Sequence, residues 1–77
     1  MNSDDIKALI EASIEDAVVN VSSDDNVHFE AIVISQEFQE KSLVQRHQMV
    51  YGCLGDKMQS EIHALSLTTL TPEENSK

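Results

Sequence analysis

The 77-residue sequence has little of what many kinds of functional site require. Its single cysteine, Cys53, excludes an internal disulfide and a tetrathiolate metal site within one chain. With one proline, two glycines and no tryptophan, neither a linker nor a glycine-rich phosphate loop is evident. No apolar run approaches the ~18 residues of a membrane span. We therefore expect one small globular domain built on a thin apolar core.

Positive charge is scarce as well. The sequence has 5 Lys and Arg against 14 Asp and Glu, a formal net charge of −9. Because nucleic-acid affinity depends largely on neutralising phosphates, such a chain should be repelled at long range from DNA, RNA and anionic membranes. The same charge favours a basic partner. Residues 1–5 lack a basic stretch followed by an apolar one, so we expect no secretory signal and a cytoplasmic location.

Sequence motifs of the common enzyme classes are also missing. The sequence contains no H-E-x-x-H pair, nucleophile elbow or dinucleotide fingerprint, so we expect a non-catalytic protein. Cys53 lies between Val50 and Leu54 in a predicted helix. This position favours a packing cysteine over a redox thiol, and the sequence leaves both open.

What the sequence does contain is an ordered series of helix and strand patterns. Apolar residues recur at helical spacing after Ser3, a predicted N-cap, and β-branched residues and alternation mark the strands. The order helix, strand, strand, helix, strand predicts an α+β domain with a three-stranded mixed sheet and helices packed on one face. The predicted segments are a helix over 3–17, strands over 18–21 and 27–34, a helical turn within 35–41, the main helix over 42–58, a strand over 62–70 and a helix start at 71–72.

Two of the predicted segments have regular apolar patterns. In the second strand, alternation divides the residues between two faces. One face carries Val27, Phe29, Ala31 and Val33, and the other carries His28, Glu30, Ile32 and Ile34. In the main helix, helical spacing predicts an apolar stripe. Its members are Leu43, His47, Val50, Tyr51, Leu54 and Met58. The two glycines of this segment, Gly52 and Gly55, weaken a helix by about 1 kcal/mol each relative to alanine, and close packing is one explanation for them.

The three histidines differ in their predicted surroundings. His47 lies on the apolar stripe, which favours a structural role. His28 opens the second strand and His63 opens the third, so parallel pairing would bring both to one edge of the sheet. Two imidazoles cannot complete a zinc or iron–sulfur site unaided, but they could if another molecule supplied thiolates. Unrelated surface histidines are the alternative.

Three blocks of the sequence resemble the BolA family. They are Gln45-Arg46-His47-Gln48-Met49-Val50-Tyr51, Ile62-His63-Ala64-Leu65 and Thr69-Leu70-Thr71-Pro72-Glu73-Glu74. The pair His28-Phe29 and then Phe38 match an earlier block, and the resemblance covers roughly residues 4–74. The short first turn and the run Val50-Tyr51-Gly52 are most similar to the acid-stress branch known as IbaG or YrbA. The resemblance implies one BolA-like domain over 1–77 with a class II KH-like fold.

The resemblance also implies a partner and a cofactor. BolA proteins pair with monothiol glutaredoxins, and a bridging [2Fe-2S] cluster is held by the glutaredoxin cysteine, glutathione and BolA side chains. The family's C-terminal ligand maps onto His63. The second ligand is usually a Cys or His between the first two strands, but Ser22–Asn26 contains neither, and His28 is the nearest candidate.

These assignments imply a role in iron–sulfur trafficking or in the iron, redox and acid-stress response. The cluster would be bound only in the complex with glutaredoxin and glutathione, and the isolated chain would hold none. A homodimer of this chain is the other assembly that the sequence leaves open. Asn75 stands where the family often has Trp in a longer last helix, so a short last helix is expected.

Some BolA proteins are reported as transcriptional regulators, so the alternative is a nucleic-acid-binding regulator of the stress response. The basic residues near the central helices are Lys41, Arg46 and Lys57. Four acidic residues surround them: Glu37, Glu40, Asp56 and Glu61. This mixture favours a solvated mixed-charge face over a DNA-contacting surface.

Overall fold

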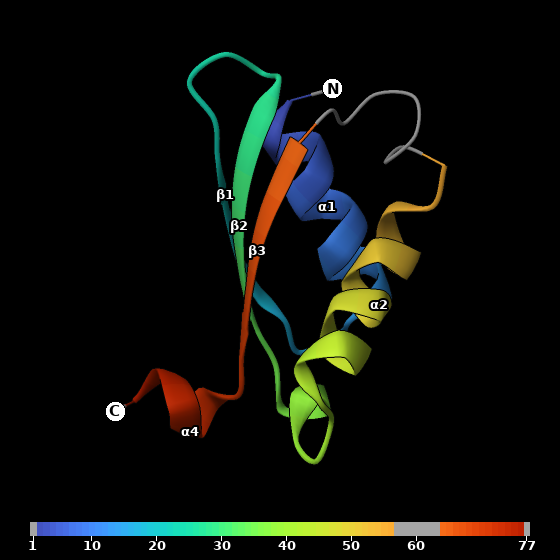
Figure 1. The fold of residues 1–77 in the computed structure, drawn as a ribbon, viewed down its shortest axis with the longest axis vertical. Coiled ribbons are helices and arrows are strands. Elements are labelled where there is room, and N and C mark those ends of the chain that lie inside the picture. The colour runs from blue at the N-terminus through green and yellow to red at the C-terminus, as the bar shows by residue number, and fades with distance from the viewer. Residues whose placement is uncertain (1, 57–63, 77) are drawn as a thin grey trace.

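The predicted order of helices and strands is confirmed by the computed structural model, which describes residues 2–56 and 64–76 (Figure 1). Within these described residues, two long helices, three strands and two short helical segments follow one another. They are α1 (Ser3–Ser13), β1 (Val18–Ser22), β2 (His28–Ile34), the 3₁₀ turn η1 (Gln36–Phe38), α2 (Leu43–Leu54), β3 (Ala64–Leu70) and α4 (Pro72–Asn75). None of the helices within this described part of the chain is long and apolar enough to cross a membrane.

The three strands form one mixed sheet in the order β1-β2-β3. Strand β2 pairs antiparallel with β1 and parallel with β3, as predicted, and the parallel register places His28 opposite Ala64. Helices α1 and α2 lie on one side of the sheet, whereas α4 lies beyond the end of β3 and toward the other side (Figure 1). The loop joining β1 to β2 and the starts of β2 and β3 share one end of the sheet (Figure 1).

The core lies between the sheet and the two long helices. Strand β2 shows the predicted alternation, since Phe29, Ala31 and Val33 are buried. The predicted strand began at Val27, but Val27 lies outside the observed strand and is 38% exposed. Helix α1 contributes Ile6 and Ile10, spaced one turn apart, as its apolar periodicity predicts.

Helix α1 differs from its prediction at both ends. Its N-cap is Asn2 rather than Ser3, because the Asn2 side chain accepts a hydrogen bond from the Asp5 backbone N–H at 3.0 Å. The Asp5 carboxylate accepts one in return from the Asn2 N–H at 3.1 Å, which completes a capping box. The helix ends at Ser13, earlier than predicted, and Ile14 adopts an extended backbone while its side chain stays in the core.

Helix α2 is shorter than predicted, and its buried face agrees only in part with the predicted stripe. Gly55 ends it as C-cap with a φ of +55°, a left-handed conformation that glycine tolerates. Its buried residues are Val50 and Leu54, whereas Leu43 is 62% and Tyr51 38% exposed, so those two members of the predicted stripe are wrong. Only one face of α2 can contact both α1 and the sheet, and that face is rotated from the stripe. Met58, the last predicted member, lies outside the described residues.

Candidate functional site

The candidate site lies at the end of the sheet where β2 and β3 begin. A cavity of about 320 Å³ opens there between the β1–β2 loop and the first residues of both parallel strands. Its lining is largely polar and acidic. The lining residues are Ser22, Ser23, Asp24, Asp25, His28, Phe29, Glu30, Ala64 and Ser66. Of the two histidines proposed as cluster ligands, His28 is therefore part of a concave surface at the predicted sheet edge.

The side chain of His28 is exposed but is held by a neighbouring carboxylate. Its Nδ1 lies 3.0 Å from Oδ2 of Asp25, and the imidazole is 74% exposed. A carboxylate only accepts hydrogen bonds, so in the neutral imidazole Nδ1 carries the proton and Nε2 keeps the lone pair. Histidines that bind metals typically donate their second ring N–H to such a group. The donor chemistry of His28 therefore fits an iron ligand.

The loop that carries Asp25 is built by its own short polar side chains. Oδ1 of Asp25 accepts from the backbone N–H groups of Val27 and His28, each at 2.9 Å. The Ser23 hydroxyl accepts from the Asn26 N–H at 2.9 Å and donates to the His28 carbonyl at 2.6 Å. Asn26 has a φ of +57°, which Asn adopts more readily than most residues. These bonds set the path by which the chain enters β2 at His28.

Asp25 was not identified from the sequence, although the signal was present. An Asp ahead of a strand commonly caps the next backbone N–H groups, and here it sits three residues before a histidine. Its pKa is well below the ordinary value of 3.8, firstly because the His28 side chain donates to it and then because two backbone N–H groups do. Asp25 therefore stays an acceptor over the whole neutral range.

The second proposed ligand, His63, lies outside the described residues. It directly precedes Ala64 in the sequence, and Ala64 is the register partner of His28. The parallel pairing on which the two-histidine prediction depended is confirmed, whereas the position of His63 itself stays a prediction. Within residues 2–56 and 64–76, no group of three or more His, Cys, Asp or Glu side chains could hold a metal ion. A centre formed at His28 would thus need ligands from elsewhere, such as partner thiolates.

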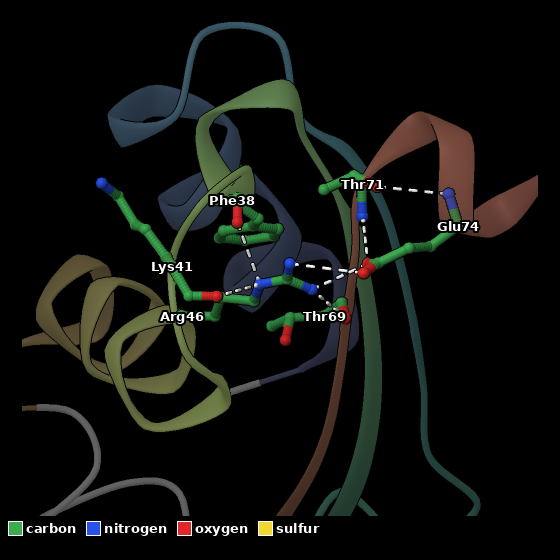
Figure 2. A network of polar contacts seen from close by, with 6 residues as sticks. All are labelled: Phe38, Lys41, Arg46, Thr69, Thr71 and Glu74. Atoms are coloured by element: carbon green, nitrogen blue, oxygen red, sulfur yellow. Dashed lines mark hydrogen bonds and ion pairs between the residues drawn. The ribbon is translucent and has the colours of Figure 1, made fainter.

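Arg46, proposed for nucleic-acid contact, is instead engaged inside the fold (Figure 2). Its Nε donates to the backbone carbonyls of Phe38 and Lys41 at 3.0 and 3.1 Å. Its two terminal nitrogens face Glu74, at 2.7 Å from Oε1 and 3.4 Å from Oε2. The guanidinium carbon lies 5.9 Å from the centre of the Phe38 ring, and the side chain is only 13% exposed. Such a group has few donors left for a phosphate.

Of the other two basic candidates, Lys41 is the one that the structure describes. Its side chain extends away from Arg46 and Glu74 into solvent (Figure 2). Lys57 lies outside the described residues. The structure therefore places only one described basic candidate where it could meet a nucleic acid, and phosphate contacts need several.

His47 and Cys53 are half-buried in the packing of α2. The His47 ring makes an edge-to-face contact with Tyr51, at 6.3 Å between centroids, and its buried Nε2 has no hydrogen-bond partner among the described residues. The Cys53 thiol donates to the Met49 carbonyl at 3.2 Å and packs against the core. Both positions agree with the structural roles that the sequence favoured.

Comparison with known proteins identifies the family. The family model for BolA-like proteins matches residues 6–74, so this chain belongs to the BolA-like proteins. It is 41% identical to a BolA protein homologue from Coxiella burnetii whose solved structure superposes with a TM-score of 0.89. That likeness covers 100% of this chain and 99% of the other, and it confirms the fold as a whole.

Two curated relatives carry functional names. The chain is 42% identical over 55 residues to SufE-like protein 1, chloroplastic/mitochondrial, of Arabidopsis thaliana, covering 71% of this chain and 15% of that protein. It is 43% identical over 47 residues to the DNA-binding transcriptional regulator BolA of Haemophilus influenzae, covering 61% and 46%. The alignments thus span less than half of either relative. Nothing in them distinguishes the acid-stress branch, which stays a prediction.

Proposed function

We propose that this BolA-like chain is a non-catalytic partner of a monothiol glutaredoxin and shares a bridging [2Fe-2S] cluster with it. The cluster is cargo for iron–sulfur trafficking or a signal in the iron, redox and acid-stress response. His63 is the first ligand from this chain and His28 the second, and glutaredoxin and glutathione supply the thiolates. The observation that carries the proposal is His28, which lies at the concave sheet edge where β3 begins and whose Nε2 has no hydrogen-bond partner among the described residues.

The residues of the site support a cluster shared with a partner over one held by this chain alone. Among the described residues that line the cavity there is one imidazole, with carboxylate and hydroxyl groups, and no thiolate. A [2Fe-2S] cluster needs four protein or thiol ligands, and imidazoles can take two of these places. Two histidines therefore leave room for the two sulfur ligands of a partner.

The test is reconstitution of the heterodimer from this chain, a monothiol glutaredoxin and glutathione. The visible absorption and circular dichroism spectra report the ligands of the cluster. His63→Ala and His28→Ala should each change the spectrum or abolish cluster binding. His47→Gln serves as control, since it removes an imidazole that helix α2 holds in its packing. A His63→Ala heterodimer with the wild-type spectrum would exclude His63, and the same result for His28→Ala would exclude His28.

A second candidate function is nucleic-acid-binding regulation, which one observation favours. The Haemophilus influenzae relative is named a DNA-binding transcriptional regulator. For this chain the residues would be Lys41, Arg46 and Lys57. We rank this function second because the N–H groups of Arg46 are hydrogen-bonded within the fold and the net charge is −9.

A further inference from the structure

We propose that Asp25 is a positioning residue: its carboxylate holds the His28 imidazole in the tautomer whose Nε2 can bind iron. The inference deepens the proposed function and rests on it, since it assumes that His28 is a ligand. It assigns a role to the loop between β1 and β2, which contains neither of the ligand types usual there in the family.

The argument begins with the two oxygens of Asp25, which have separate partners. Oδ1 accepts from the N–H groups of Val27 and His28, each at 2.9 Å, which fixes the carboxylate relative to the start of β2. Oδ2 is thereby directed at the His28 ring and lies 3.0 Å from Nδ1. The same carboxylate thus anchors both the backbone and the imidazole of one residue.

The position of the carboxylate determines which nitrogen of the imidazole carries the proton. A neutral imidazole has one N–H donor and one acceptor nitrogen, and a carboxylate can only accept. Facing Asp25, Nδ1 takes the donor role, and Nε2 is left with the lone pair that a metal ligand requires. The His28 side chain is 74% exposed, so a partner can approach the ring from the solvent side.

The decisive variant is Asp25→Asn. The amide can keep the hydrogen bonds from the backbone, but it reverses the direction of the hydrogen bond with the His28 ring. Its carbonyl oxygen can still accept from the Val27 and His28 N–H groups. Its NH₂ group then faces Nδ1, which must accept, so the ring proton moves to Nε2. Asp24→Asn is the matched control for charge, since Asp24 lines the same cavity and its loss removes the same charge one residue away, but Asp24 makes no hydrogen bond to the described residues.

The first measurement uses the isolated, cluster-free chain. The ¹⁵N chemical shifts of the His28 ring, recorded well above the ordinary histidine pKa of ~6.5, report which nitrogen carries the proton. We expect Nδ1–H in the wild type and Asp24→Asn, and Nε2–H in Asp25→Asn. A wild-type ring protonated mainly on Nε2 would overturn the inference, whatever the heterodimer does.

The second measurement uses the heterodimer with glutaredoxin and glutathione. Loss of an outer partner of a metal-bound histidine typically lowers affinity by about 10–100-fold. A chelator titration should therefore remove the cluster from Asp25→Asn at a correspondingly lower concentration than from Asp24→Asn. Equal retention in both variants would overturn the positioning role. An unchanged spectrum in His28→Ala would instead remove His28 as a ligand, which is a failure of the proposed function and leaves the tautomer result standing.

Discussion

Arg46 and Glu74 join helix α2 to helix α4 through an ion pair of 2.7 Å, although 28 positions separate them in the sequence (Figure 2). Glu74 Oε1 also accepts from the N–H of Thr71, the N-cap of α4, at 2.9 Å, so the third helical residue of this capping box also holds Arg46. Two of the blocks by which the sequence resembles the BolA family thus meet in one structural contact. Their residues serve the fold, and the candidate cluster site lies at the opposite end of the sheet (Figure 1).

Arg46→Ala should destabilise the fold by about 1–3 kcal/mol, since it leaves the carbonyls of Phe38 and Lys41 without their donor and uncovers the Phe38 ring. Lys41→Ala removes the same charge from a side chain that points away, so it should stay within about 0.5 kcal/mol of wild type. Urea unfolding followed by circular dichroism measures both. Equal stability of the two variants would contradict the structural role of Arg46.

The Arg46–Glu74 pair should make stability depend on pH. The pKa of Glu74 is lowered from its ordinary value of 4.5, mainly by the hydrogen bond from Arg46 and then by the Thr71 N–H. The folded chain therefore binds fewer protons there than the unfolded chain. The stabilisation is fully present above pH 4.5 and is lost as pH falls through the lowered, folded-state pKa.

Glu74→Gln tests this dependence. The difference in unfolding free energy between wild type and Glu74→Gln should be largest near neutral pH and should shrink as pH falls below 4.5. Comparing variants cancels the general relief of acidic repulsion in this chain of net charge −9. Glu73→Gln removes the same charge without the Arg46 contact. If the difference in unfolding free energy between wild type and Glu74→Gln stayed constant as the pH became acidic, Arg46 would not lower the pKa of Glu74.

The two glycines of the α2 segment should respond oppositely to alanine. At Gly52, inside the helix, an added Cβ would meet no atom of the described residues within 4 Å, so close packing against them is not the reason for this glycine. Gly52→Ala should stabilise the fold by about 0.5–1 kcal/mol through helix propensity. Gly55 has a φ of +55°, so Gly55→Ala should destabilise it. Thermal unfolding of both variants measures this, and a destabilising Gly52→Ala would point to a partner that contacts the helix there.

Nucleic-acid binding by the isolated chain should be weak. At about 0.15 M salt, a mobility-shift assay should give dissociation constants no tighter than the ~1–100 μM of non-specific binding. The reasons are the net charge of −9 and the internal engagement of Arg46. A sub-micromolar constant for one DNA sequence, lost in Lys41→Ala, would favour the regulator over the glutaredoxin partner.

The sequence by itself was sufficient for the order of elements and the topology of the sheet. Strand β2 is predictable because Phe29, Ala31 and Val33 alternate with polar or exposed residues, and alternation is a local property of a pleated strand. The parallel pairing of β2 with β3 follows because a helix long enough for a crossover separates them. The same pairing brought His28 to the edge where β3 begins, so the location of the candidate site was also predictable.

Only the tertiary structure decided which polar groups meet and which face of α2 is buried. Helical spacing defines stripes on α2 but not their orientation, which depends on contact with α1 and the sheet, so Leu43 and Tyr51 are exposed and Arg46 points inward. The pairing of Asp25 with His28 depends on the turn at Asn26, whose left-handed backbone directs the carboxylate back onto the ring. Such contacts are set by backbone direction in three dimensions, which residue type and spacing do not specify.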